Sequence, residues 1–364
     1  MSIIIFIIIL GALVLVHELG HFIVAKRAGV RVDEFGIGFP PRLWSKKVGE
    51  TVYSVNAFPI GGFVKIFGED PNEESLKGKD SSRSLTSKSR LVQAWIIGAG
   101  VIFNILFAWI LISLGFMIGL PYSVDDSKYG ARVQNTNLTI TQVLPKTPAE
   151  KAGLKGGDII VTLVSGADTL TSPNVPATQR FISSHDEMTL TYRRGAETKT
   201  TNITSEENTT LGRRTIGVSM DIVGMLRLGF FESLSVGAQT TVSITTAMTE
   251  GMIDFFKSLF VGKANLDTVS GPVGIVGIVS DASTLGFIHL VSLTAIISIN
   301  LAIINLLPFP ALDGGRLFFL LIETIKRSPI KPGIANFANG VGFLILIAFM
   351  VFVTFHDVVK IVQG

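Results

Sequence analysis

Four apolar stretches, each long enough to cross a lipid bilayer, constrain the fold of this chain more than any other feature. They span approximately residues 1–25, 93–120, 288–310 and 336–356. A helix needs roughly 20 predominantly apolar residues to cross the hydrocarbon core. Hydrophobic residues make up 48% of the chain and charged residues only 16%, which is too apolar for an ordinary cytosolic enzyme. We therefore expect a polytopic α-helical membrane protein with about four transmembrane helices.

Basic residues are concentrated in two of the connections between these stretches. Lysines and arginines from Lys26 to Arg90 follow the first stretch, and those from Arg316 to Lys331 follow the third. Connections rich in Lys and Arg stay in the cytosol. The first and third helices then both run inward, and segment 121–287 lies outside the cytosol.

The first apolar stretch contains the motif His17-Glu18-Leu19-Gly20-His21. Residues four apart share a helix face, so both imidazoles can bind one ion while Glu18 projects toward a metal-bound water. Such a motif can match by chance on the wet face of a soluble helix. Inside a bilayer polar side chains are expensive, which favours a function. The motif predicts a Zn²⁺ site, with Glu18 as general base.

A second motif, from Asn305 to Gly315, follows the third stretch. Pro308 and Pro310 break the helix, so the chain unwinds at membrane depth, which is tolerated only beside protein or water. Asp313 can then be the third ligand. Two histidines and a carboxylate leave one position open for water, as in catalytic zinc sites. The alternative is that Asp313 caps the next helix.

These motifs resemble those of the site-two protease family of intramembrane metalloproteases, and most closely its bacterial regulated-proteolysis branch. Further similar segments are Val32–Pro40, Ile60–Lys65 and Ser270–Ile275. The resemblance implies that His17, His21 and Asp313 bind Zn²⁺, that Glu18 is the general base, and that Asn305 helps to hold the substrate backbone.

The same resemblance implies partners and a location. The substrates would be transmembrane segments of membrane proteins, such as anti-sigma factors or signal-peptide remnants, already cut once by another protease. The enzyme would lie in the bacterial inner membrane, with its active site near the cytosolic face. One departure concerns the second span, where the family usually has Gly-Pro before an asparagine. Here Val101 follows Gly100, which leaves the role of Asn104 open.

The segment between the second and third stretches resembles a PDZ domain over about residues 128–222. The expected elements follow the order of a PDZ domain. They are a strand at 140–144, a short helix at 147–154 and a strand that begins with Gly-Asp-Ile-Ile. Such domains bind chain ends or extended peptides at a sheet edge. Thr215–Val218 is a candidate carboxylate-binding strand, and composition predicts a flexible loop at 200–210. A purely steric role is the alternative. The family's best-known enterobacterial type has two such modules, whereas this chain has one.

Residues 225–262 mix phenylalanines with charged side chains. This pattern favours an amphipathic helix at the membrane surface over a fifth span, which would also place Asp313 on the wrong side. The predicted parts are a membrane core at 1–127, the PDZ-like domain at 128–222, an interfacial segment at 223–287 and a second membrane core at 288–364.

The cytosolic connection contains two expected strands, 51–58 and 63–67, joined through 59–62 as a β-hairpin. An extended substrate could pair with its edge, and the alternative is a self-contained sheet. Residues expected to contact the substrate are Gly61, Gly62, Phe63, Asn305, Pro308 and Pro310.

Two other functional classes compete with the protease. One is a non-catalytic membrane scaffold that works through its PDZ-like domain, which would not need Glu18. The other is a metal transporter, which would need further intramembrane ligands along a path across the bilayer. The chain has no cysteine, which excludes cysteine catalysis and disulfides, and its net charge of +3 gives no indication of nucleic-acid binding.

Overall fold

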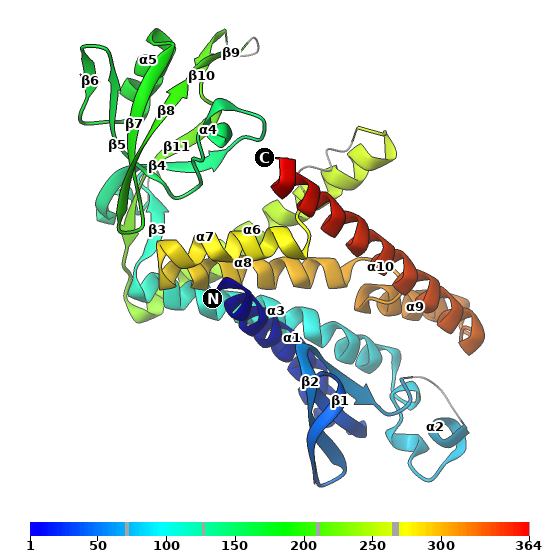
Figure 1. The fold of residues 1–364 in the computed structure, drawn as a ribbon. Helices are drawn as coiled ribbons and strands as arrows, with labels where there is room; N and C mark the ends of the chain where they lie inside the picture. Colours follow the sequence, from blue (N-terminus) through cyan, green and yellow to red (C-terminus); the bar gives the residue numbers. More distant parts are fainter. Residues whose placement is uncertain (70–72, 126–127, 209–211, 264–268, 364) are drawn as a thin grey trace. The chain divides into compact units, whose positions relative to one another are not determined.

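The computed structural model describes residues 1–69, 73–125, 128–208, 212–263 and 269–363, which form two compact units (Figure 1). The helical unit comprises Met1–Ile112, Val236–Val279 and Leu293–Gln363. The sheet unit comprises Ser113–Ser235 and Ser280–Ser292.

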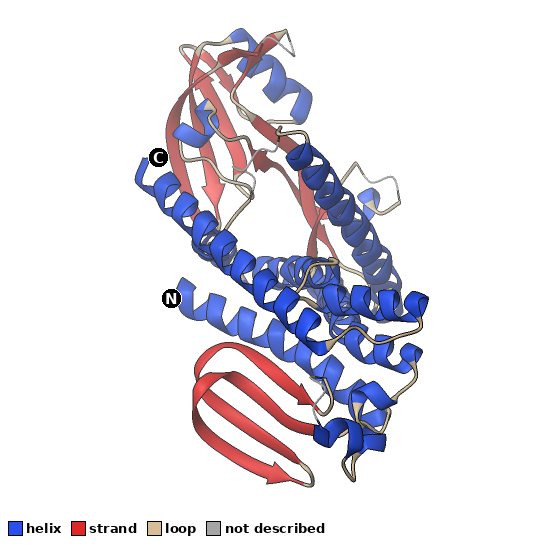
Figure 2. Cartoon of the chain, turned by 90° about the vertical axis from the view of Figure 1, so that its right-hand side faces the viewer, coloured by secondary structure: helices blue, strands red, loops and turns tan. Residues whose placement is uncertain are grey.

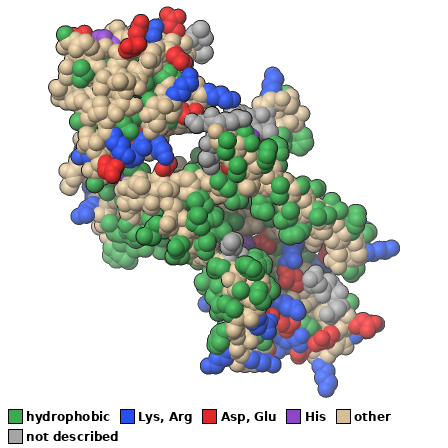
Figure 3. All heavy atoms as spheres, in the orientation of Figure 1, with side chains coloured by type: hydrophobic (Ala, Val, Ile, Leu, Met, Phe, Trp, Pro, Cys, Tyr) green, Lys and Arg blue, Asp and Glu red, His purple; other side chains and the backbone are tan. Residues whose placement is uncertain are grey.

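Four helices in the described residues are long and apolar enough to cross a membrane. They are α1 (Ser2–Arg27), α3 (Arg90–Ile118), α8 (Phe287–Leu306) and residues Pro332–Val359 of α10 (Pro332–Gln363). Their most apolar windows are only 11% to 33% buried within the chain. A helix that is apolar on all sides yet little covered by protein is suited to contact with lipid. Figure 3 shows hydrophobic side chains spread over the surface of the helices. The chain is a multi-pass membrane protein.

The remaining helices are shorter or more polar. They are α2 (Glu73–Lys77), α4 (Pro148–Lys151), α5 (Val175–Ser184), α6 (Phe230–Phe260), α7 (Pro272–Leu285) and α9 (Asp313–Lys326), with 3₁₀ turns η1 (Ser81–Arg83), η2 (Leu85–Ser87) and η3 (Gly130–Arg132). Helix α6 has 31 residues, but its composition does not make it a candidate span. Among the described residues before α8, only α1 and α3 are candidate spans by length and composition.

Strands β1 (Val32–Val48) and β2 (Thr51–Ile66) form an antiparallel sheet that follows α1. The sheet packs on α1 through Phe22, whose ring lies 5.2 Å from that of Phe35 and 6.0 Å from that of Tyr53. This contact holds the sheet beside the helix that carries the two histidines.

The register of this sheet corrects the predicted hairpin. Residues 51–58 and 62–66 are strands but do not pair with each other, because each pairs with the first part of β1, residues 32–37. The tight turn lies at 49–50, between Val48 and Thr51. Segment 62–66 therefore lies at an edge of the sheet, and we call it the edge segment.

The sheet unit contains an antiparallel sheet in the order β3-β11-β4-β5-β7-β8, with β6 pairing with β5 (Figure 2). Its strands are β3 (Leu120–Ser123), β4 (Gln134–Val143), β5 (Ile159–Ser165), β6 (Asp168–Leu170), β7 (Glu187–Arg194), β8 (Glu197–Thr204) and β11 (Val218–Leu226). Strands β9 (Glu206–Asn208) and β10 (Arg213–Thr215) form a separate pair. Alternating apolar residues, among them Ile140, Leu163 and Leu190, are fully buried and form the core.

Two expectations for this unit differ from the structure. The predicted loop at 200–210 is largely strand in its described part, because threonine favours extended structure and β7 offers β8 a full row of partners. Residues 209–210 lie outside the described residues. The sheet also extends beyond 128–222, since β3 pairs with the last residues of β11.

The Gly-Asp-Ile-Ile motif forms a buried ion pair. Asp158 has no exposed surface, and both its carboxylate oxygens accept hydrogen bonds of 2.7 Å from Arg194. The backbone N–H of Lys155 donates to the same carboxylate. The hydrogen bonds to Asp158 raise the pKa of Arg194 above its usual range. This pair ties the start of β5 to the end of β7.

Candidate metal centre

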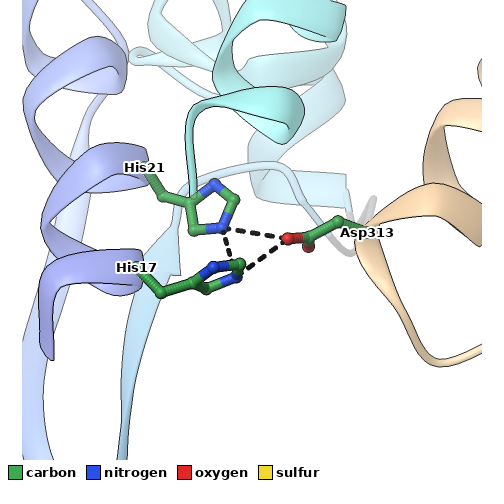
Figure 4. A group of neighbouring side chains, drawn as sticks. All are labelled: His17, His21 and Asp313. Carbon is green, nitrogen blue, oxygen red and sulfur yellow. Dashed lines mark hydrogen bonds and ion pairs between the residues drawn. The ribbon is translucent and has the colours of Figure 1, made fainter. Parts of the chain in front are cut away.

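Helix α1 brings His17 and His21 together at a spacing of one helical turn. Both residues are 7% exposed, and their Nε2 atoms are 3.2 Å apart. Figure 4 shows the two imidazoles pointing toward the carboxylate of Asp313. Oδ2 of Asp313 lies 3.0 Å from Nε2 of His17 and 3.2 Å from Nε2 of His21. The structure thus brings the three predicted ligands together.

Asp313 reaches this point because the chain unwinds before α9. The N-cap of α9 is Leu312, so Asp313 lies one residue past the cap position, in the first turn. Its carboxylate faces the two imidazoles. Gly314 and Gly315 allow the unwound segment to fold back, since a Cβ on either would overlap the carbonyl oxygens of Leu307 or Phe309.

The spacing of the three candidate ligand atoms comes within about 0.3 Å of the spacing in a zinc site. In a tetrahedral site with bonds of about 2.0–2.2 Å, ligand atoms lie roughly 3.3–3.6 Å apart. The three observed separations are 3.0, 3.2 and 3.2 Å. Nδ1 of His21 lies 2.8 Å from the Ile96 carbonyl oxygen, which can only accept, so a neutral His21 has its lone pair on Nε2. These close contacts need either a shared proton or a bound cation between the atoms, and three such atoms around one point suit a metal ion.

Helix α3 lies directly against the two imidazoles. A Cβ on Gly100 would come within 2.7 Å of Nε2 of His17 and closer still to Nε2 of His21. Farther along α3, Nδ2 of Asn104 lies 3.3 Å from Nδ1 of His17. Gly20 permits this approach, because a Cβ there would lie 2.6 Å from the carbonyl oxygen of Ala99. Sequence reasoning missed these contacts, and the only signal for them was the polar Asn104 four residues after Gly100.

Glu18 faces a cavity of about 270 Å³ next to the histidines. The backbone N–H of Val64, in the edge segment, donates to its carboxylate. A Cβ on Gly62 would lie 3.6 Å from Cγ of Glu18. The cavity is also lined by Phe63, by two residues of α3 and by Arg316, which forms an ion pair with Glu69. Arg316 and Glu69 were not anticipated from the sequence.

The predicted substrate-contacting residues divide into two groups. Phe63 lines the cavity and Gly62 adjoins Glu18, whereas the others do not line it. Asn305 is in the last turn of α8, and Pro308 and Pro310 lie in the unwound segment that follows. Gly61 lies in β2 with a φ of +115°, a conformation suited to glycine.

Comparison with known proteins adds independent support. The model of peptidase family M50 matches residues 5–349. A Clostridium perfringens (strain 13) protein with a provisional zinc metalloprotease name is 35% identical over 361 residues, covering 96% of each chain. The zinc metalloprotease RasP of Bacillus licheniformis is 30% identical, and the regulator of sigma-W protease RasP of Bacillus subtilis (strain 168) is 29% identical. Each of these alignments covers 99% of both chains.

The family match and the relatives extend over nearly the whole chain, from the histidine helix to the last span. These matches agree with the site, because a metallopeptidase needs metal ligands such as His17, His21 and Asp313 and a carboxylate such as Glu18 beside them. This chain is a member of peptidase family M50, the site-two protease family.

Proposed function

We propose that this protein is an intramembrane zinc endopeptidase that cuts transmembrane segments of membrane proteins in regulated intramembrane proteolysis. The observation that carries the proposal is the meeting of His17, His21 and Asp313 within one candidate metal site, with Glu18 beside it. The ligands come from a candidate span and from the unwound segment after another one. A site at that depth suits a substrate that is itself embedded in lipid.

His17, His21 and Asp313 would hold the zinc ion, which polarises a carbonyl and lowers the pKa of a bound water toward roughly 7. Glu18 would accept a proton from the attacking water and later deliver it to the leaving amine. The Val64 N–H supports this role because it holds the Glu18 carboxylate in place. The cavity next to Glu18 offers a route for water.

The edge segment supports the binding of an unwound substrate. The carbonyls of a transmembrane helix are already hydrogen-bonded within the helix, so the substrate must become extended before it is cut. Segment 62–66 pairs with β1 on one side and lies next to Glu18. An extended substrate would add to this edge by backbone hydrogen bonds, with Gly61, Gly62 and Phe63 in contact with it.

Asn305, Pro308 and Pro310 would contact the same substrate farther from the metal. The unwound segment is held by isolated turn hydrogen bonds, such as that from the Leu312 N–H to the Phe309 carbonyl, and it precedes Asp313 directly. We assign to Asn305 a hydrogen bond to the substrate backbone. The two prolines would shape the path along which the extended chain reaches the cavity.

The proposed location is the bacterial inner membrane, with the metal site near the cytosolic face and the sheet unit outside the cytosol. The basic connections after α1 and α8 support this orientation. Figure 3 shows charged side chains gathered near the sheet of β1 and β2. Helices α6 and α7, in the predicted interfacial segment 223–287, would lie along the membrane surface and precede the second membrane core at 288–364 in the chain.

We also propose that residues 128–222 form a PDZ-like domain that recruits or excludes substrates. A groove between α5 and the chain at 213–220 supports a peptide-binding role. Its lining includes Thr215–Val218, which is not the single strand predicted from the sequence, because β10 ends at Thr215 and β11 begins at Val218. Substrates would reach the enzyme after another protease has removed their outer domains. The relative named regulator of sigma-W protease supports anti-sigma factors as one substrate class.

The test is cleavage of a panel of transmembrane peptides by purified protein in detergent. We expect cleavage within the apolar segment, loss of cleavage after treatment with a zinc chelator, and recovery when Zn²⁺ is restored. Flux of Zn²⁺ into proteoliposomes, measured in parallel, should be absent. A protein that binds zinc but cuts no peptide would contradict the protease, and zinc flux would favour a transporter.

A further inference from the structure

Both candidate histidine ligands are contacted on their second ring nitrogen by helix α3. Nδ1 of His21 donates to the carbonyl oxygen of Ile96, and Nδ1 of His17 faces the side-chain amide of Asn104. Ile96, Gly100 and Asn104 are spaced four residues apart, so they form one stripe on α3. This stripe meets both imidazoles at once.

Metal-binding histidines need a defined tautomer. A neutral imidazole that binds an ion through Nε2 carries its proton on Nδ1, and that proton needs an acceptor. For His21 the Ile96 carbonyl is the acceptor. For His17 the acceptor must come from Asn104, because its amide is the group that faces Nδ1.

The amide of Asn104 can face His17 with either of its two polar atoms. If Nδ2 of Asn104 faces His17, it donates a hydrogen bond to Nδ1 of His17. Nδ1 then carries no proton, and the proton of the neutral imidazole lies on Nε2. In that arrangement Oδ1 of Asn104 is buried without a partner among the described residues. Rotating the amide by 180° turns Oδ1 to Nδ1–H and frees Nε2 for the ion. The second arrangement is the one that matches a metal site.

The burial of Asn104 supports a role beyond packing. The side chain is 0% exposed, in a helix that is otherwise strongly apolar. A buried amide in such a span is unfavourable compared with a leucine of similar size. The position of Asn104 is also held from α8, because the hydroxyl of Ser298 donates to its backbone carbonyl at 2.8 Å.

We infer that Asn104 is a positioning residue that accepts a hydrogen bond from Nδ1 of His17 and thereby directs Nε2 of His17 to the metal. The inference rests on the proposed zinc site. Asn104 does not touch the reacting atoms and acts through His17. Together with the Ile96 carbonyl, it makes α3 the support for both histidine ligands.

The test measures zinc affinity by competition with a chromophoric chelator in detergent. Asn104→Leu keeps the volume but removes the acceptor, so zinc should bind about 10- to 100-fold more weakly. Asn104→Asp keeps an acceptor and should bind zinc as the wild type does. Ser113→Ala is the matched control, because Ser113 is a buried polar residue of the same helix, away from the histidines. Its zinc affinity should be unchanged.

A second measurement reports the tautomer in metal-free protein. The chain has five histidines, so ¹⁵N-histidine spectra are simple, and a His17→Gln variant assigns the His17 signals. We expect the Nδ1–H tautomer in the wild type and in Asn104→Asp, and a shift toward Nε2–H in Asn104→Leu. Thermal unfolding of each variant verifies that it is folded.

The outcomes separate this inference from the proposed function. Wild-type affinity and an unchanged His17 tautomer in folded Asn104→Leu would overturn the inference. If Asn104→Leu does not fold, Asn104→Asp decides, since weakened zinc binding in that folded variant would also overturn it. A wild-type protein that binds no zinc would contradict the proposed function instead, while the metal-free spectra would still test Asn104.

Discussion

The contact between Gly100 and the two imidazoles predicts that one added methyl group will disable the metal site. In Gly100→Ala, the new Cβ would lie 2.7 Å from Nε2 of His17, whereas ordinary contact begins at 3.4 Å. The ring must therefore move by about 0.7 Å, and the His21 ring by more. Bond lengths in a zinc site tolerate only about ±0.2 Å. The displacement is several times larger than this tolerance.

We expect Gly100→Ala to bind zinc at least about 100-fold more weakly, which corresponds to about 2.7 kcal/mol. Peptide cleavage should fall by a similar factor, because a displacement near 1 Å can reduce a rate about 100-fold. The fold should survive, since alanine favours a helix interior over glycine by about 0.5–1 kcal/mol.

Gly98→Ala is the matched control, because it makes the same change on the same helix and its Cβ would meet nothing within 4 Å. This variant should keep wild-type zinc affinity and cleavage. The assay is chelator competition with purified proteins in detergent, together with thermal unfolding and cleavage of one transmembrane peptide. Equal zinc affinity in the two variants would show that α3 does not pack on the ligand nitrogens as the structure has it.

Three further predictions concern the third ligand, the sheet unit and its buried ion pair. Asp313→Ala should lower zinc affinity and peptide cleavage together, by more than the factor of about 10 to 100 that is typical when a residue supporting a ligand is replaced. Full zinc occupancy of this variant by metal analysis would show that Asp313 is not a ligand. In the second variant, residues 124–222 are deleted and Ser123 is joined through Asn-Gly to Val223, its partner in the sheet. We expect this variant to keep its zinc, to cut a short peptide as before, and to cut a bulky substrate that the intact enzyme rejects. If the folded, zinc-loaded variant cuts neither substrate, the sheet unit is part of the catalytic assembly. Arg194→Met leaves the Asp158 charge buried without its partner, so unfolding should become easier by about 3–5 kcal/mol. Lys199→Met, at an exposed ion pair, should change unfolding little, and equal effects of the two variants would contradict the buried pair.

The four spans could be predicted because lipid demands long apolar helices, and the sequence shows them directly. Two helices that run in the same direction end on the same side of the membrane, so the sequence also predicts that the histidine motif and the segment around Asp313 lie at a similar depth. The structure brings these residues together.

The supporting contacts from α3 could not be predicted from hydrophobic periodicity. This helix is apolar all round, so its sequence does not show which side faces α1. Asn104 is the one amide or hydroxyl side chain between Gln93 and Ser113 on this helix. The backbone carbonyl of Ile96 carries no sequence signal at all, and Gly100 gains its meaning only once the imidazoles are placed beside it.

Strand pairing was the other limit. The sequence indicates strands at 51–58 and 63–67, but it does not show that both pair with residues 32–37, because Asp33, Glu34 and Gly36 are not typical of a central strand. The loop predicted at 200–210 failed for a related reason. Polar threonines suggested a loop, whereas they form β8 because the neighbouring strand β7 supplies hydrogen bonds along its length.

The central claim is that Glu18 moves protons at a zinc site formed by His17, His21 and Asp313. Its most direct test compares wild type and Glu18→Gln for zinc content and for cleavage of one transmembrane peptide. The amide keeps the shape of the side chain but cannot accept the proton, so we predict equal zinc content and a loss of about 10²- to 10⁴-fold or more in cleavage rate. Cleavage at the wild-type rate by Glu18→Gln would contradict the account.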